Sequence, residues 1–322
     1  MNRKWINGLI IIVLLLIVAV VVIDYMSTRP GHRPSNPFAF DVSEYEAVDP
    51  SMVHYAETRQ IRMSEAQPVQ ICSMEGNICL LTDSHLQIIT PTGEEVARFA
   101  IPPLPLGVTV SADHTIFIAY SDHVIAFSPD GEVIRRSEQV TGNTRLTSLT
   151  HSGEQLFAAD AGNRQVVVFS DRLELVSMFR GESGVSEQHG FILPSARFDL
   201  AINPENELWV VNPGLHLLQN YSHDGRFRRQ WGKPSFDIDG FSGCCNPSYI
   251  AFRDDGRIVT SEKGLVRIKV YHESGELASV VAPPASFKNG NLAPAIAVLT
   301  GDIIAALDYD SHMIRIFEPI QP

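Results

Sequence analysis

Apolar and polar positions along most of the chain alternate in short runs of the kind that β-strands show. The stretch Trp231–Tyr271 shows the arrangement clearly, with apolar runs at Tyr249–Phe252, Ile258–Thr260 and Val266–Tyr271 separated by turn residues. The period of two in Arg267–Tyr271 fits an outer strand with one solvated face. We therefore expect an antiparallel meander of short strands in this part of the chain.

The same unit recurs six times from Val53 onward. The full unit has an apolar run, a tight turn, a second run, a corner, a third run and an outer strand. The corners are Asp83–His85, Asp122–His123, Asp160–Arg164, Asn212–Gly214, Glu262–Lys263 and Asp308–His312. Four strands in about 44 residues are typical of a β-propeller blade. The sequence therefore predicts an all-β fold, a six-bladed β-propeller.

The sixth copy stops after its third strand, and a strand-like segment at His54–Met63 precedes the first copy. An unpaired sheet edge is a liability that a closed ring removes. We expect the early segment to pair as the missing outer strand of the last blade and so to close the ring.

One family resemblance rests on the corners and on the loops between copies. The corner Ala159–Val166 (ADAGNRQV) resembles the NHL repeat, D-x-x-N-x-R-[IV], and the loops Gly181–Pro194 and Gly232–Pro247 resemble the G…G-x-F…P segment between NHL blades. The motif G-C-C-N-P, followed by T-S-E-K-G-x-x-R-I-K-V-Y, is similar to one in uncharacterised, membrane-anchored bacterial NHL proteins. The resemblance covers about residues 53–317 and implies a propeller with a central channel, but it implies no particular activity.

The N-terminus has a different pattern. Trp5–Ile23 is almost entirely apolar and follows the basic pair Arg3–Lys4. As a helix it would span about 28 Å, close to the hydrocarbon core of a bilayer. The apolar segment ends without a small-x-small cleavage site, which favours an uncleaved signal anchor over a cleaved signal peptide. The basic pair keeps the N-terminus in the cytoplasm by the positive-inside rule.

These features predict three parts: a signal-anchor transmembrane helix at residues 1–26, a Pro-rich linker at 27–50 and the propeller at 51–322. The expected location is the inner (cytoplasmic) membrane, crossed once, with the propeller in the periplasm or outside the cell. The membrane is therefore one expected partner, reached through the N-terminal helix.

The composition and the absence of certain motifs exclude some classes of function but do not identify one. The formal net charge of -12 in 322 residues argues against nucleic-acid binding, which needs a basic surface. No Gly-rich phosphate loop, G-x-S-x-G elbow or C-x-x-C motif is present. No catalytic residue and no cofactor follow from the sequence.

Two adjacent cysteines, Cys244 and Cys245, with Asn246, lie in the loop that leads into the fifth copy. Because strands alternate in direction, this loop and the corner Glu262–Lys263 should share one rim near the channel mouth. The pair can form a strained vicinal disulfide with a redox or recognition role, bind a soft metal such as copper or zinc, or serve only the structure of the loop.

Further candidates have mainly structural interpretations. Glu262–Lys263 is either a solvated corner or part of the rim site, and Arg267 is expected to anchor the corner. Cys72 and Cys79 face each other across a turn, so they are either a cross-strand disulfide or two buried thiols. Four histidines near corners are candidate metal ligands, although polar corner positions on separate blades explain them as well; they are His85, His123, His216 and His312.

The sequence favours a binding or scaffold domain that docks a protein partner or ligand on the rim carrying Cys244–Cys245, within a redox or electron-transfer assembly. The alternative is a metal-dependent lyase or hydrolase with its site in the channel. Peptide-amidating lyases are NHL-type propellers with histidine-bound zinc, but the inner strands here offer no matching set of histidines. A sugar- or peptide-binding sensor is a third hypothesis.

Overall fold

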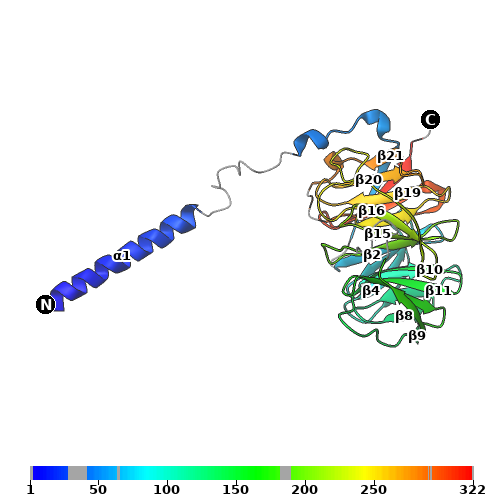
Figure 1. Cartoon of the computed structure of the whole chain (residues 1–322), viewed down its shortest axis with the longest axis horizontal. Helices are drawn as coiled ribbons and strands as arrows, with labels where there is room; N and C mark the ends of the chain where they lie inside the picture. Colours follow the sequence, from blue (N-terminus) through cyan, green and yellow to red (C-terminus); the bar gives the residue numbers. More distant parts are fainter. Residues whose placement is uncertain are drawn as a thin grey trace. The chain divides into compact units, whose positions relative to one another are not determined.

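The computed structural model describes residues 3–27, 42–63, 66–181, 190–288, 290 and 292–320. The chain divides into two compact units, Met1–Val42 and Ser43–Pro322, shown in Figure 1.

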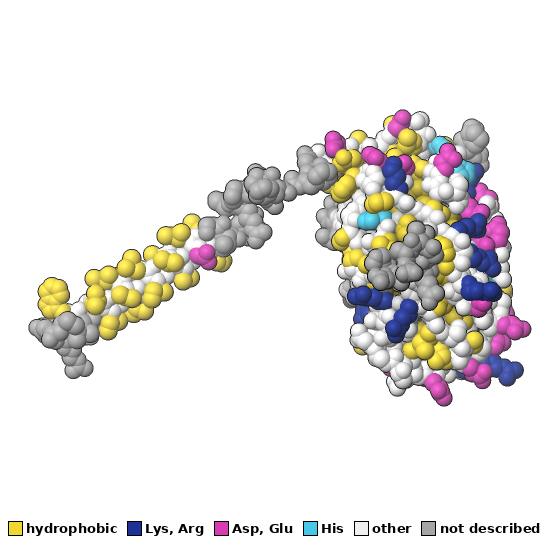
Figure 2. All heavy atoms as spheres, viewed as in Figure 1, with side chains coloured by type: hydrophobic (Ala, Val, Ile, Leu, Met, Phe, Trp, Pro, Cys, Tyr) yellow, Lys and Arg dark blue, Asp and Glu magenta, His cyan; other side chains and the backbone are white. Residues whose placement is uncertain are grey.

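The first unit contains the helix α1 (Arg3–Ser27). Its stretch Asn7–Met26 is long and apolar enough to cross a membrane. The side chains from Leu9 to Met26 are exposed, and Figure 2 shows that nearly all of those in view are hydrophobic. A helix surrounded by lipid has such a surface. This helix suggests that the protein is anchored in a membrane.

The second unit consists of six four-stranded antiparallel sheets, which are the six blades. Blade 1 contains β2 (Pro68–Met74), β3 (Asn77–Thr82), β4 (His85–Ile89) and β5 (Glu95–Ala100). Blade 2 contains β6 (Gly107–Val110), β7 (Ile116–Ala119), β8 (Val124–Phe127) and β9 (Val133–Arg136). Blade 3 contains β10 (Leu146–Ser152), β11 (Gln155–Asp160), β12 (Gln165–Ser170) and β13 (Leu175–Phe179).

Blade 4 contains β14 (Leu200–Ile202), β15 (Leu208–Asn212), β16 (Leu217–Tyr221) and β17 (Phe227–Trp231). Blade 5 contains β18 (Tyr249–Phe252), β19 (Ile258–Glu262), β20 (Arg267–Tyr271) and β21 (Leu277–Ala282). Blade 6 contains β22 (Ala295–Val298), β23 (Ile304–Asp308), β24 (Met313–Pro319) and β1 (Tyr55–Arg62). Short 3-10 turns occur at Ser43–Tyr45, Pro50–Met52, Pro284–Ser286 and Thr300–Asp302.

The first strand of each blade lines the centre of the ring. Each of these inner strands contacts the inner strands of both neighbouring blades, and β22 contacts β2, so the ring is closed. Polar side chains near the starts of inner strands join neighbouring blades: Gln70 accepts a hydrogen bond from the Val108 amide at 3.0 Å, and Asp199 accepts one from the Ile250 amide at 2.9 Å. The six-bladed propeller predicted from the sequence is confirmed.

The predicted closure of the ring is confirmed as well. Strand β1 pairs antiparallel with β24, from Tyr55 opposite Pro319 to Arg62 opposite Met313. A side-chain pair reinforces the junction, because Arg315 donates to both carboxylate oxygens of Glu57, at 2.9 and 2.5 Å. The last blade is therefore built from both ends of the propeller sequence.

The second and third strands are buried on both faces, because each blade is packed between two others. This explains why runs such as Ile116–Ala119 and Val124–Phe127 are continuously apolar, whereas the outer strand Val133–Arg136 is exposed throughout. The expectation that Arg267–Tyr271 is a half-solvated outer strand is wrong. It is the third strand, β20, and is fully buried, with its polar side chains paired inside the protein.

Ring closure can be tested with two truncations. A chain lacking residues 1–63 loses β1, and with it the burial of Tyr55, worth about 2 kcal/mol, the partial burial of Ile61 and the hydrogen bonds of the β1–β24 pairing. Because 1 kcal/mol corresponds to about 2–4 °C in a domain of this size, we expect the melting temperature to fall by about 10 °C or more.

The matched control is a chain lacking residues 1–42, which keeps the whole second unit. Calorimetry should show this control melting as the full propeller does. If both truncations melt alike, β1 does not close the ring.

Candidate functional site

The loop between β17 and β18, which carries Cys244–Cys245, is fastened to the corner between β19 and β20. The Ser242 amide donates to Glu262 Oε2 at 2.9 Å. Asn246 exchanges two hydrogen bonds with the Lys263 backbone, at 2.8 and 2.9 Å, and is itself buried. The structure thus brings the cysteine loop and the Glu262–Lys263 corner together, as expected from the alternation of strand directions.

Glu262 is the centre of a buried ionic cluster. Its Oε1 lies 3.0 Å from Arg267 Nε and 2.7 Å from Lys269 Nζ, and all three side chains are fully buried. Burial alone would raise the pKa of Glu262, but the charges of Lys269 and Arg267 outweigh it and hold that pKa below its ordinary value. Burial, opposed by Glu262, lowers the pKa of Lys269 to about 8. The interpretation of Glu262 as part of a solvated corner is therefore wrong.

The two cations also bind the backbone of the cysteine loop. Arg267 donates to the carbonyl oxygens of Phe236 and Gly240 at 2.9 and 3.0 Å, and Lys269 donates to those of Ile238 and Gly240 at 3.0 and 2.6 Å. Carbonyl groups that a loop would otherwise bury without partners are satisfied in this way. The geometry gives Arg267 the anchoring role that the sequence suggested.

Blade 3 has a counterpart of this cluster without cationic side chains. Asp160, which ends β11 as Glu262 ends β19, accepts hydrogen bonds from the Arg145 amide at 2.9 Å, from Asn163 Nδ2 at 2.8 Å and from Gln165 Nε2 at 3.0 Å. The corner motif noticed in the sequence therefore acts by tying the end of the second strand to the loop that enters the same blade.

Cys244 and Cys245 are free thiols in this structure, with sulfur atoms 3.0 Å apart. This is longer than the roughly 2.05 Å of a disulfide bond. Cys244 is exposed and Cys245 is buried. Burial and the Cys244 thiol raise the pKa of the Cys245 thiol, against the opposing effect of Lys263. A vicinal disulfide between Cys244 and Cys245 stays a prediction. The two sulfur atoms already lie side by side, as its formation would require.

Cys72 and Cys79 stand directly opposite each other on β2 and β3, the register expected from the sequence. Both are free thiols here. The hydrogen bond with the Cys79 thiol, together with burial, raises the pKa of Cys72 well above its ordinary value. A disulfide between them also stays a prediction.

The four candidate histidines lie on four different blades. His123 Nδ1 is 2.8 Å from Asp122 and stacks on Tyr120, and His85 is hydrogen-bonded to Thr82 at 3.1 Å. His216 and His312 occupy left-handed backbone positions at their corners. Within the ranges that the structure describes, no three His, Cys, Asp or Glu side chains form a group that could hold a metal ion. A metal site at these histidines stays a hypothesis of the sequence.

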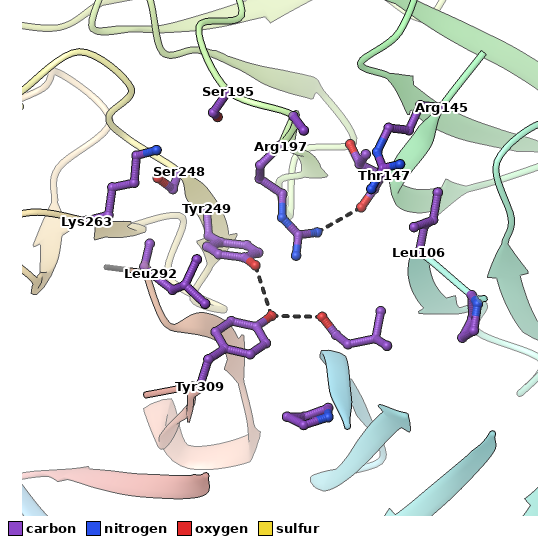
Figure 3. Close-up of a pocket in the computed structure, with 15 residues that line it drawn as sticks. Leu106, Arg145, Thr147, Ser195, Arg197, Ser248, Tyr249, Lys263, Leu292 and Tyr309 are labelled. Atoms are coloured by element: carbon purple, nitrogen blue, oxygen red, sulfur yellow. Dashed lines mark hydrogen bonds between the residues drawn. The ribbon is translucent and has the colours of Figure 1, made fainter. Parts of the chain in front are cut away.

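A pocket of about 490 Å³ lies where the inner strands begin (Figure 3). Its lining residues come from all six blades: Pro68, Val69, Pro105, Leu106, Arg145, Thr147, Ser195, Ala196, Arg197, Ser248, Tyr249, Lys263, Leu292, Ala293 and Tyr309. Lys263 and Ser248 connect it to the cysteine loop, since both are hydrogen-bonded to Asn246. We call these fifteen residues the mouth pocket, because they surround one end of the central channel.

Tyrosines and one arginine organise the mouth pocket. The Tyr249 hydroxyl lies 3.0 Å from that of Tyr309, which donates to the Val69 carbonyl oxygen at 2.8 Å. The Arg197 guanidinium lies 4.7 Å from the centre of the Tyr249 ring and donates to the Thr147 carbonyl oxygen at 3.0 Å. Figure 3 shows these contacts, which join blades 1, 3, 4, 5 and 6.

One residue of the mouth pocket, Lys263, is a candidate from the sequence, whereas the sequence does not point to Arg145, Arg197, Tyr249 or Tyr309. Three of these four lie at or just before the start of an inner strand, and Tyr309 directly follows β23. Comparing the six copies at these two positions would have pointed to the mouth.

The fold defines the chain as a six-bladed β-propeller. It is similar to a catalytically inactive variant of virginiamycin B lyase from Staphylococcus aureus, solved with quinupristin, with a TM-score of 0.57 and 13% identity over 83% of this chain and 100% of that one. It is also similar to a protein of unknown function from Bacteroides caccae, with a TM-score of 0.56 and 13% identity over 74% of this chain and 88% of that one.

A third similar structure is the WD40 β-propeller domain of Doa1, with a TM-score of 0.53 and 9% identity over 82% of this chain and 97% of that one. At these identities the likeness shows the fold alone. No family model and no curated protein sequence matches the chain. The propeller fold is compatible with a binding or scaffold role.

The buried cluster predicts that its members contribute unequally to the free energy of unfolding. Glu262→Gln leaves Arg267 and Lys269 buried without a counter-charge, and we expect it to lower the free energy of unfolding by about 3–5 kcal/mol. Lys269→Met leaves the Glu262–Arg267 ion pair, whose two charges balance. It should therefore lower the free energy of unfolding clearly less. Urea unfolding at pH 7 measures both; equal losses would contradict the charge argument.

The pH dependence follows from Lys269. Its pKa is about 8 in the folded protein, against an ordinary 10.5, so between these values the unfolded chain binds more protons. The free energy of unfolding of the wild type should therefore rise from pH 8 to pH 10, relative to that of Lys269→Met. A constant difference between the two proteins over this range would show that the pKa of Lys269 is not lowered.

Proposed function

We propose that the chain is a membrane-anchored, extracytoplasmic binding domain of the NHL type, which docks a ligand or a protein partner at the channel mouth. The observation that carries this is the mouth pocket, formed by all six blades and bordered by the cysteine loop. Binding sites commonly lie in such concave, partly apolar sites with a few polar groups. The apolar helix α1 supports anchoring, and the Asp160 corner supports the NHL assignment.

The cysteine pair supports a redox contribution to that role. Cys244 is exposed at the rim, and its sulfur atom is 3.0 Å from that of Cys245, so thiol–disulfide exchange with a partner's disulfide needs little rearrangement here. The two thiols would lose two protons and two electrons, and the partner's disulfide would take them up. The alternative, a metal-dependent lyase or hydrolase, has no ligand group among the described residues to support it.

The proposal can be tested by photo-crosslinking in native membranes. The full-length protein carries a benzophenone maleimide on Cys244. Its control combines Cys244→Ser with Ser274→Cys and carries the same probe on the exposed β20–β21 turn, at the other end of blade 5. We expect one dominant crosslinked species from Cys244 and none of it from the control. The partner identified in that species must then bind the purified protein. Equal crosslinking yields from the probe on Cys244 and from the probe on the β20–β21 turn would contradict docking at the mouth.

The state of the cysteine pair can be determined by alkylation of protein purified without reductant. If the pair is a disulfide, intact mass and peptide mapping should show Cys244 and Cys245 unlabelled until reduction. In reduced protein, Cys244 should be labelled about tenfold or more faster than Cys245, because it is exposed and burial raises the pKa of Cys245. Immediate labelling of both residues without reductant would rule out the disulfide.

A further inference from the structure

One side of the mouth pocket is cationic. Arg145 precedes β10, Arg197 precedes β14 and Lys263 follows β19, so the three come from the consecutive blades 3, 4 and 5. No Asp or Glu belongs to the lining set, although the chain as a whole has 37 acidic and 25 basic residues. Figure 3 shows the three basic side chains in the upper part of the view.

Among the described residues these cations form no ion pair, although the Asp199 carboxylate acts on Arg197 from beyond ion-pair distance. Among the residues that the structure describes, no carboxylate lies within 4.0 Å of Arg145, Arg197 or Lys263, whereas the buried Arg267 has one and the buried Arg315 has two. The carboxylate of Asp199 lies deeper, in the set that lines the channel, and accepts a hydrogen bond from the Ile250 amide. Within the described part of the chain, the positive charge at the mouth is therefore opposed by Asp199 at longer range but not by a direct ion pair.

Arg197 is held ready for a ligand. Its guanidinium donates to the Thr147 carbonyl oxygen at 3.0 Å and stacks on the Tyr249 ring. A neutral carbonyl and an aromatic ring fix its orientation without cancelling its charge. Guanidinium groups held in this way bind planar carboxylates with a favourable geometry and little loss of side-chain entropy.

The opposite side of the pocket is apolar. It is formed by Leu292 and Ala293 of blade 6, Pro68 and Val69 of blade 1, and Pro105 and Leu106 of blade 2. Between the two sides lie the hydroxyl groups of Tyr249 and Tyr309, which hydrogen-bond to each other, and that of Tyr309 also donates to the Val69 carbonyl oxygen. A ligand that fills the pocket thus meets positive charge on one side and apolar surface on the other.

We propose that the mouth pocket binds an organic carboxylate with an apolar body, its carboxylate against Arg145, Arg197 and Lys263 and its apolar part against blades 6, 1 and 2. The volume of about 490 Å³ suits a small ligand or the last residues of a peptide. The carboxylate can therefore come from a small organic acid or from the C-terminus of a polypeptide. The inference rests on the proposed function, because it names the ligand of the same mouth.

The test is calorimetric titration of the full-length protein in detergent with two matched probes. N-acetyl-phenylalanine has a free carboxylate, and N-acetyl-phenylalaninamide has the same apolar body without the charge. We expect the acid to bind about tenfold or more tightly than the amide, as loss of a charge-assisted hydrogen bond predicts. A tetrapeptide ending in phenylalanine, as the acid and as the amide, distinguishes the sources: tighter binding of the peptide acid indicates a polypeptide C-terminus.

The variant Arg197→Gln should remove the preference for the acid. Its matched control is Arg172→Gln, an exposed arginine in the β12–β13 turn at the other end of blade 3, which should keep the preference. Both variants should melt as the wild type does, so that a loss of binding is not a loss of folding.

The outcomes separate the two proposals. Equal binding of acid and amide overturns carboxylate recognition while binding at the mouth survives. Binding of neither probe at about 10 mM overturns the ligand class, and the crosslinking at Cys244 then decides independently whether the mouth docks a partner. An acid preference that persists in Arg197→Gln places the anion elsewhere and also overturns the inference.

Discussion

Closure of the ring by β1 and β24 is the constraint on which the rest of the structure depends. The two strands come from opposite ends of the propeller sequence, and their pairing leaves no blade with a missing outer strand. The junction is also tied to the neighbouring blade, because the Tyr55 hydroxyl accepts a hydrogen bond from Arg253 and the His54 amide donates to Val280. Only a closed ring brings blades 1 and 6 against each other, and with them the Tyr309–Val69 contact at the mouth.

A second constraint acts within blades and fixes the loops around the mouth. The last residue of the second strand is Asp160 in blade 3, Asn212 in blade 4 and Glu262 in blade 5. Each accepts a backbone hydrogen bond from the loop that enters its own blade, donated by Arg145, Ile192 and Ser242 respectively. The same position is thus filled by an aspartate in blade 3, by an asparagine in blade 4 and by a glutamate with two cationic partners in blade 5. The pocket at the mouth has firm walls because these corners hold its loops.

The sequence contains enough information for the blades, their number and the closing strand, because all three follow from strand periodicity and from counting. It also places Cys244–Cys245 beside Glu262–Lys263, since antiparallel strands return to the same end of a sheet. It does not distinguish a polar side chain that faces water from one that faces loop carbonyls, and for this reason Arg267–Tyr271 resembles an outer strand although it is buried. The alternation is the same in both cases.

The periodicity of the sequence does not predict the mouth pocket, for a related reason. Arg145, Arg197 and Tyr309 each look like an ordinary loop residue in its own copy, and only the circular arrangement of the blades gathers them. Net charge is no guide either, because electrostatic interactions through solvent are screened over about 8–10 Å, so an acidic chain can carry a local cationic site. Other arginines that the structure describes as largely buried, such as Arg253 and Arg315, are paired with carboxylates.

Arg197 departs from that rule inside a pocket, because no carboxylate of the described residues lies within ion-pair distance and Asp199 acts on it only from farther away. A charge without a close partner costs free energy of solvation. Departures of this kind are expected where a protein gives up stability for function rather than where it only packs. Recognition of an anion at the mouth therefore depends first on Arg197, whose guanidinium is already positioned by Thr147 and Tyr249 of the neighbouring blades.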